Sequence, residues 1–172
     1  MISTKRGTDT SRPDRSTDLA EWFAAHDGLL VVPLRNPVLD TLGHHPTSSY
    51  AERYWLPTIG PTASLLHRKL AAGLEHRPDG YPVHLPTLAR EIGLGASTGR
   101  QAPLTKSLIR LVGYNLAEVT DGRFAVRPTL PPLTRRQTAR LPPHLAEHHR
   151  RAALARPPST PAHQGHSVDR EV

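Results

Sequence analysis

The dipeptide Asp121-Gly122 constrains the fold of this chain more than any other feature of its sequence. An Asp-Gly pair between two runs of alternating apolar residues favours a type I′ turn, because both turn residues must take positive φ. A two-residue turn of this kind also sets the register of the two strands that it joins. The predicted cross-strand pairs, which share one apolar face, are Val119 with Phe124 and Ala117 with Val126. The sequence therefore predicts an antiparallel hairpin at 116–127.

A helix and a short strand are expected at the start of the segment that leads to this hairpin. Within residues 59–75 (IGPTASLLHRKLAAGLE), one narrow stripe is formed as in an amphipathic helix, by Ile59, Ala63, Leu66, Leu70 and Leu74. Pro61 suits the first turn of that helix. After a turn at RPDG, the alternation of apolar residues at 81–85 predicts a short strand.

Two further helices are expected between this strand and the hairpin. The apolar residues of LPTLAREIGL recur at the i, i+3, i+4 and i+7 spacing of one helical face, which predicts a helix over 86–92. Gly93 can end this helix in a left-handed cap. The next predicted helix is PLTKSLIRLVGY (103–114), which has apolar residues on one face and Lys106 and Arg110 on the other.

The order helix, strand, helix, loop, helix and hairpin over residues 59–127 resembles the winged helix-turn-helix family. The matching segments are LPTLAREIGL for the first helix of the motif, PLTKSLIRLVGY for the second and NLAEVTDGRFAV for the entry into the wing. The spacing from Ala89 to Gly93 fits the family pattern, in which a small residue lets the two helices cross closely. The resemblance implies an α+β, mostly helical fold, with a three-helix core and a small antiparallel β-wing. A second resemblance, to a group of uncharacterised actinobacterial proteins, is carried by YWLPTIGPTA, RPDGYPV and LPPLTRRQTARLP and brings no activity with it.

The resemblance and the composition together divide the chain into four parts. These are a flexible N-terminal arm with a short helix expected at 17–26 (1–47), the winged-helix domain (48–130), a basic helical extension (131–156) and a disordered tail (157–172). Within the arm, the apolar run GLLVVPL is expected to be an edge strand or an extended segment, because Pro33 cannot donate to a sheet ladder. The connection at 93–102 is longer than the turn of about three or four residues in a compact helix-turn-helix.

Basic residues are concentrated in one region of the chain. Residues 1–99 carry 10 basic and 10 acidic side chains, whereas residues 100–156 carry 11 basic and 3 acidic ones, a net charge of +8. A local cationic field of this kind favours a polyanionic partner more than an evenly spread excess of positive charge would. The predicted helix 103–114 and the predicted hairpin both lie in this region.

The winged-helix resemblance implies how such a partner would be bound. Helix 103–114 would lie in the major groove of double-stranded DNA, and hairpin 116–127 would act as the wing. The residues expected to contact DNA are Arg100, Gln101, Thr105, Lys106 and Arg110 around that helix, and Arg123 in the hairpin. Further phosphate contacts are expected from Arg135, Arg136, Arg140, Arg150 and Arg151. The protein is accordingly predicted to be a DNA-binding transcriptional regulator, which as a homodimer could read paired half-sites.

A protein-docking module is the alternative function. Winged domains also serve as docking modules, and the arm at 19–34 offers Trp22, Phe23 and the LLVV run as an apolar contact surface. In that case Lys106 and Arg110 would be the ordinary solvated face of a core helix. The two functions differ in their response to salt, because DNA binding weakens steeply as salt is added, whereas apolar docking tolerates it.

No enzymatic site is expected from the sequence. The segment HLAEH at 144–148 matches the H-x-x-E-H pattern of inverted zinc peptidases, but such a site needs a third protein ligand. The 24 residues that follow offer carboxylates only in the predicted disordered tail. The loop GLGASTG at 93–99 lacks the G-K-[ST] ending of a phosphate-binding loop. Neither a metal nor a cofactor is therefore expected, and the protein is not predicted to be an enzyme.

Composition also indicates a cellular location. The chain has no Cys, which excludes disulfides and Cys-based zinc sites. Its apolar runs fall short of the roughly 20 residues that span a bilayer. The first residues, MISTKRGTDTSRPDRSTD, lack the apolar core of a signal peptide. A cytoplasmic protein with no membrane partner is therefore expected.

Overall fold

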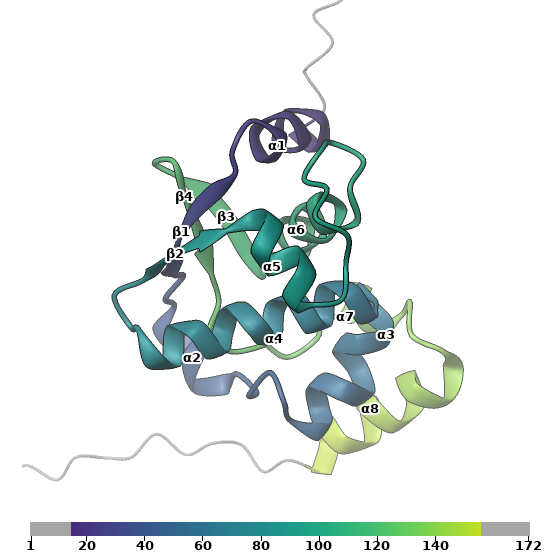
Figure 1. The fold of residues 1–172 in the computed structure, drawn as a ribbon. Coiled ribbons are helices and arrows are strands. Elements are labelled where there is room, and N and C mark those ends of the chain that lie inside the picture. The colour runs from purple at the N-terminus through teal and green to yellow at the C-terminus, as the bar shows by residue number, and fades with distance from the viewer. Residues whose placement is uncertain (1–14, 156–172) are drawn as a thin grey trace, which may run out of the picture.

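A computed structural model describes residues 15–155 of the 172-residue chain. The fold is α+β, with helices packed around a four-stranded mixed sheet (Figure 1). The elements, in chain order, are α1 (Arg15–Ala24), β1 (Gly28–Pro33), α2 (Pro37–Leu42), the π-helical turn η1 (Ala51–Trp55), α3 (Leu56–Ile59), α4 (Pro61–His76), β2 (Tyr81–His84), α5 (Leu85–Glu91), α6 (Pro103–Gly113), β3 (Ala117–Thr120), β4 (Arg123–Val126), α7 (Arg135–Thr138) and α8 (Pro143–Ala155). The predicted tail at 157–172 and the first residues of the predicted arm lie outside the described residues.

The sheet has the strand order β2-β1-β4-β3, so the strand nearest the N-terminus lies in its interior. Strand β1 runs antiparallel to β2 on one side and parallel to β4 on the other. The prediction of an edge strand or an extended arm at 28–34 is therefore wrong. The predicted small antiparallel wing is likewise only one half of a larger mixed sheet.

Pro33 is tolerated in this interior strand because of where it lies. The pairing of β1 with β2 ends at Val31 and Tyr81, whereas the pairing with β4 continues to Pro33 and Val126. Beyond the proline, the Leu34 amide donates to the Val126 carbonyl at 2.8 Å, so the ladder with β4 is maintained. Proline removes a hydrogen bond only where a neighbouring strand needs its N–H, and here β2 has already ended.

Helix α1 and strand β1 contribute to the main hydrophobic core. Phe23 and Val31 are completely buried, and the ring of Phe23 meets that of Phe124 edge-to-face at 5.5 Å. Helix α1 also packs against α6 (Figure 1). The helix expected at 17–26 is thus present, but the flexible arm and the domain boundary after residue 47 are wrong for residues 15–47.

The predicted hairpin is confirmed in both its turn and its register. Asp121 and Gly122 have φ of 50° and 72°, as a type I′ turn requires. The paired residues are Ala117 with Val126 and Val119 with Phe124. Local sequence therefore determines this half of the sheet.

Helix α5 ends as predicted, but its partner helix does not cross it as expected. Gly93 has a φ of 78°, and the Leu94 and Gly93 amides donate to the carbonyls of Ala89 and Arg90, the two bonds of a Schellman cap. Helix α6 then packs most extensively against α4, and after that against α1, rather than against α5. The long connection between α5 and α6 permits this placement, and the expected close crossing at Ala89 is not the main helix contact.

The predicted basic extension contains two helices up to residue 155, α7 and α8. The residues around α7 pack onto the core. Thr134 and Gln137 form the reciprocal capping box that begins α7. Leu133 and Leu141, on either side of α7, are both buried. The Trp55 indole donates to the Pro131 carbonyl at 2.9 Å, which ties this segment to η1. The predicted basic extension is therefore attached to the fold at its beginning.

Gly73, in the last turn of α4, is needed because the ring of Tyr81 lies directly against it. The Tyr81 hydroxyl donates to the Leu70 carbonyl at 2.9 Å, and burial raises the pKa of this phenol to about 12. A Cβ at position 73 would lie 2.2 Å from atoms of the Tyr81 ring. We expect Gly73→Ala to lower the free energy of unfolding by about 1–3 kcal/mol through overpacking, although alanine is favoured over glycine in helices by roughly 1 kcal/mol. Urea denaturation of the two proteins measures this difference.

Gly113→Ala is the matched control, because a Cβ at that position of α6 has no neighbour within 4 Å. This variant should be neutral or up to about 1 kcal/mol more stable than the parent protein, as helix propensity predicts. Equal effects of the two substitutions would contradict the seating of Tyr81 on α4.

Candidate nucleic-acid interface

Helix α6 has one buried and one cationic face, as its sequence predicts. Leu104, Leu108 and Leu111 are almost completely buried. Lys106 and Arg110, four residues apart and therefore one turn apart, are both exposed on the opposite face. The two cations thus lie on the same side of the helix, outside the hydrophobic core.

A groove of about 770 Å³ runs between α6 and α7, and we call it the α6–α7 groove. Its charged lining residues are Lys106 and Arg110 from α6, Arg136 from α7, and Arg140, which follows α7. Among the described residues that line this groove, none is Asp or Glu. Its neutral lining includes Tyr114, Asn115 and Gln137. Four cations therefore converge on one hollow without a carboxylate to neutralise them.

Helix α7 is held in place at its first residues, which sets the position of the second wall. The Thr134 hydroxyl accepts from the Gln137 amide at 3.2 Å, and the Gln137 side-chain oxygen accepts from the Thr134 amide at 2.8 Å. Just before this cap, the Leu133 amide donates to the hydroxyl of Tyr50 at 2.8 Å. The arginines of this wall therefore project from a capped turn that is fastened to the core.

The four cations differ in how they are held. The Arg110 guanidinium donates through Nη1 to the Ile59 carbonyl at 3.1 Å, which leaves its other nitrogens for a ligand. Lys106, Arg136 and Arg140 form no ion pair with any side chain in the described part of the chain. One cation is thus positioned by the backbone and three are free to meet an anion.

Of the six residues predicted to contact DNA, Lys106 and Arg110 are brought together in the groove. Thr105 must be removed from the predicted surface: it is 2% exposed, and its hydroxyl donates to the Thr98 carbonyl at 3.2 Å. The loop before α6 covers this side of the helix, so Thr105 faces inward.

The other three predicted contacts lie outside the groove. Arg100 is exposed, but its guanidinium is 3.1 Å from the carboxylate of Glu21 on α1. Gln101 precedes α6 and Arg123 begins β4, and both are exposed without lining the groove. Arg136 and Arg140, which the sequence suggested only as additional phosphate contacts, are instead the partners of Lys106 and Arg110. The proximity of α7 to α6 depends on tertiary packing, and no local pattern indicates it.

The apolar surface that the docking alternative requires is used inside the protein. Phe23, Leu29 and Val31 are buried, and of the LLVV run only Leu30 is notably exposed, at 41%. Trp22 is half-buried and packs on the core. Residues 19–34 therefore do not present the apolar docking face that was expected.

The H-x-x-E-H segment lies on α8 and does not form a metal centre. The His148 imidazole contacts the Tyr54 hydroxyl and the Arg53 guanidinium. The Glu147 carboxylate is bonded to Arg150 at 2.6 Å and to Arg151 at 2.8 Å. Within residues 15–155, no three side chains of the His, Cys, Asp and Glu types are arranged to hold a metal ion.

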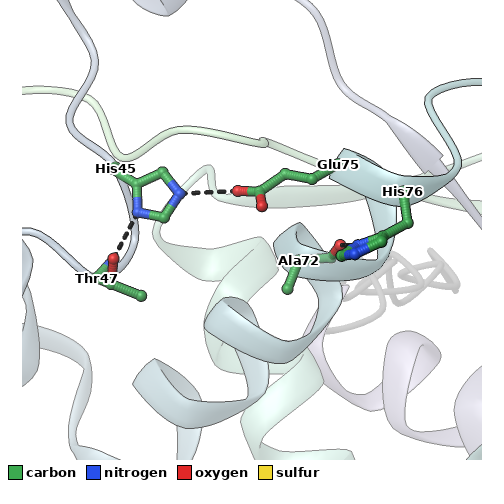
Figure 2. A network of polar contacts seen from close by, with 5 residues as sticks. All are labelled: His45, Thr47, Ala72, Glu75 and His76. Carbon is green, nitrogen blue, oxygen red and sulfur yellow. Dashed lines mark hydrogen bonds and ion pairs between the residues drawn. The ribbon is translucent and has the colours of Figure 1, made fainter.

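A second polar network joins the loop before η1 to α4 (Figure 2). The His45 imidazole contacts the Thr47 hydroxyl through Nδ1 at 2.6 Å and the Glu75 carboxylate through Nε2 at 2.8 Å. A hydroxyl, an imidazole and a carboxylate in this order also occur in catalytic triads, as the nucleophile, the base and the group that orients the base. The His45 and Glu75 side chains are however 55% and 50% exposed, so water reaches them freely. We interpret the network as a tether between the loop and the helix.

The α6–α7 groove remains the feature of the described structure that most clearly suggests a ligand. None of the helices between residues 15 and 155 combines the length and the apolar character that crossing a bilayer requires. Comparison of the chain with protein-family models, curated proteins and solved structures gave no match.

Proposed function

We propose that this chain is a DNA-binding protein, with the arrangement of a winged helix-turn-helix domain and a role in regulating transcription. In this proposal α6 lies against the major groove of double-stranded DNA, and the β3–β4 hairpin is the wing. The order α4, β2, α5, α6, β3 and β4 supports the assignment, since it matches the order that the resemblance implies.

The observation that carries the proposal is the charge of the α6–α7 groove. Lys106, Arg110, Arg136 and Arg140 line it, without a carboxylate among its described lining residues. A phosphate backbone is the polyanion for which such a surface is suited, because each neutralised phosphate releases condensed counterions. Holding four exposed cations side by side has no benefit to the fold, and their repulsion is relieved when an anion binds.

The cations and the neutral residues have different parts in this proposal. Arg136 and Arg140, on the second wall, contact backbone phosphates and position the protein without reading sequence. Lys106, on the first wall, contacts the backbone from the other side, and the neutral Gln101, which is exposed just before α6, is the side chain that approaches base edges. A homodimer that reads two half-sites is part of the proposal, with α8 as the candidate surface for pairing.

The structure modifies the way in which DNA is approached. The main supports of α6 are α1 and α4, rather than α5. On its cationic side, α6 is flanked by α7 across the α6–α7 groove. The duplex would therefore contact α6 and α7 together, and the two walls of the groove would hold one backbone between them. The proposal thus depends on the paired cations of α6 and α7 more than on a tight crossing of α5 and α6.

The double substitution Lys106→Ala, Arg136→Ala tests this proposal, since it removes one exposed cation from each wall. We expect the parent protein to bind random-sequence duplex DNA with an affinity that falls steeply with salt. In the variant, the slope of log affinity against log salt should become shallower by about 2, because each lost phosphate contact removes roughly 0.9 from the slope. Fluorescence anisotropy with a labelled duplex at several salt concentrations measures both quantities.

Arg77→Ala is the matched control for charge. Arg77 follows the C-terminal end of α4, whereas Arg110 is anchored on the Ile59 carbonyl, just before the first residue of that helix. A 16-residue helix is roughly 24 Å long, so the two arginines lie far apart. This variant should bind like the parent protein. Absence of duplex binding at low salt, or an equal loss in the double variant and in Arg77→Ala, would remove the proposed function.

A further inference from the structure

Helix α8 is attached to the rest of the protein through two histidines that meet two tyrosines near η1. The Tyr50 hydroxyl lies 2.8 Å from Nε2 of His149, and the Tyr54 hydroxyl is bonded to Nδ1 of His148. The rings of Tyr54 and His149 also meet edge-to-face at 4.8 Å. Figure 1 shows α8 lying alongside the segment that contains η1 and α3. Leu145 and Ala146 of this helix also pack against the core, and the polar part of its docking consists of imidazole contacts.

The contacts of Tyr50 are met by an uncharged His149. The Leu133 amide donates to the Tyr50 hydroxyl oxygen at 2.8 Å. The hydroxyl proton is then available for His149 Nε2 at 2.8 Å, which accepts it while that nitrogen carries a lone pair. A proton added to Nε2 removes this acceptor, and the hydroxyl would keep the contact only by turning its own proton away.

The contacts of His148 require a neutral imidazole. Arg53 Nη1 lies 3.2 Å from His148 Nε2, and a guanidinium can only donate. Nε2 of His148 is therefore the acceptor, and the ring proton is on Nδ1, where it is donated to the Tyr54 hydroxyl. Protonation of this imidazole would set a second cation directly against Arg53.

We propose that His148 and His149 form an acid-sensitive latch, which holds α8 on η1 while both imidazoles are neutral and releases the helix when they are protonated. We call these two histidines and their partners Tyr50, Tyr54 and Arg53 the imidazole latch. This latch does not depend on the proposed DNA binding.

The charged groups around the imidazole latch offer little compensation for an added proton. On α8, Glu147 already binds Arg150 and Arg151, and the remaining histidine of that helix, His144, is exposed. On η1, Glu52 lies 3.7 Å from Arg68. His44, from the preceding loop, is stacked on the ring of Tyr50 at 3.7 Å and brings no negative charge to the latch. The carboxylates near the latch are thus engaged by arginines.

The direction of the effect follows from the environment of His149. Burial, and the neighbouring His148, lower the pKa of the His149 imidazole below its ordinary value of 6.5. The folded, docked form therefore binds the proton less readily than the released form does. Docking is complete above about pH 6.5 and weakens as the pH falls below this value.

Release of α8 would also reach the α6–α7 groove, a consequence that rests on the proposed function. The Tyr50 hydroxyl joins His149 to the Leu133 amide, immediately before the cap of α7. Loss of His149 as a partner would loosen the turn from which Arg136 and Arg140 project.

Amide hydrogen exchange of the full chain at pH 7.5 and pH 5.5 tests the latch. Protection factors are corrected for the intrinsic effect of pH on exchange. We expect the protection of α8 amides to fall at least tenfold at pH 5.5, while amides in the middle of α4 stay protected and show that the fold is intact. Titration of the His149 ring protons by NMR should give a midpoint that coincides with the loss of α8 protection.

Two variants make the result specific to the latch. The first is the double variant His148→Gln, His149→Gln. A glutamine side-chain oxygen can accept the hydrogen bond that Nε2 accepts, but glutamine does not titrate, so the protection of α8 should be the same at both pH values. The exposed His144→Gln, on the same helix, should keep the pH response of the parent protein. Equal protection of α8 at the two pH values in the parent protein, an unchanged pH response in the double variant, or a His149 ring midpoint unrelated to the release would each overturn the proposal.

Discussion

Replacing Phe23 by alanine should lower the free energy of unfolding by about 3–5 kcal/mol, the usual cost of truncating a fully buried phenylalanine. Phe23 has no exposed surface, and its ring packs edge-to-face against Phe124 at 5.5 Å and against Trp22 at 5.1 Å. Truncation would leave a cavity between α1 and the sheet, and few neighbours there can move to fill it. Urea denaturation of the full chain, followed by tryptophan fluorescence, measures the change.

Leu30→Ala is the control for this experiment, because Leu30 is an apolar residue of the adjacent strand and is 41% exposed. Its truncation should lower the free energy of unfolding by less than about 1 kcal/mol, since it removes little buried apolar surface. Similar costs for the two variants would mean that α1 is not part of the core. The same result would restore the flexible arm as a binding surface and with it the docking alternative.

The features that could be predicted from the sequence are those that nearby residues determine. The turn at Asp121-Gly122 requires positive φ at two adjacent positions, and few arrangements other than a type I′ hairpin meet this requirement. The Gly93 cap and the Thr134–Gln137 capping box are likewise formed within a single turn of chain. The amphipathic pattern of residues 103–114 correctly placed Lys106 and Arg110 on the outer face of α6.

The features that could not be predicted depend on contacts between distant parts of the chain. Strand β1 pairs in parallel with β4, more than ninety residues away in the sequence, and no turn connects the two strands to indicate this. Pro33 suggested an edge position because its neighbours in space were unknown. Thr105 lies at the flank of the helical face, and only the fold of the preceding loop, through Thr98, determines that it is buried.

The candidate site shows the same division. Each wall of the α6–α7 groove was recognisable as basic from its own residues. Their convergence was not, because the position of α7 is set by Tyr50, which lies 83 residues before its partner Leu133. Charge counting over 100–156 therefore identified the region, and the tertiary fold selects which of its cations act together.

Acidification should destabilise this protein through His67, by about 3 kcal/mol between pH 6.5 and pH 4. His67 is 1% exposed, and burial lowers the pKa of its imidazole from 6.5 to about 4, with the hydrogen bond to the Arg127 carbonyl acting in the opposite direction. The unfolded chain takes up a proton at this residue near pH 6.5, whereas the folded chain takes it up only near pH 4. Stability is therefore full above pH 6.5 and is lost as the pH falls, at about 1.4 kcal/mol for each unit of the difference in pKa. Urea denaturation at half-unit intervals of pH measures this loss.

His67→Gln isolates the contribution of this imidazole. A glutamine amide can donate to the Arg127 carbonyl, as Nε2 of His67 does at 2.9 Å, but it does not titrate. The variant should be less stable than the parent protein at pH 7.5, because the packing changes, and the difference between the two should shrink by about 3 kcal/mol on going to pH 4. The exposed His144→Gln should leave the slope unchanged. A parallel pH dependence in the parent protein and in His67→Gln would show that the imidazole is reached by water in the folded state.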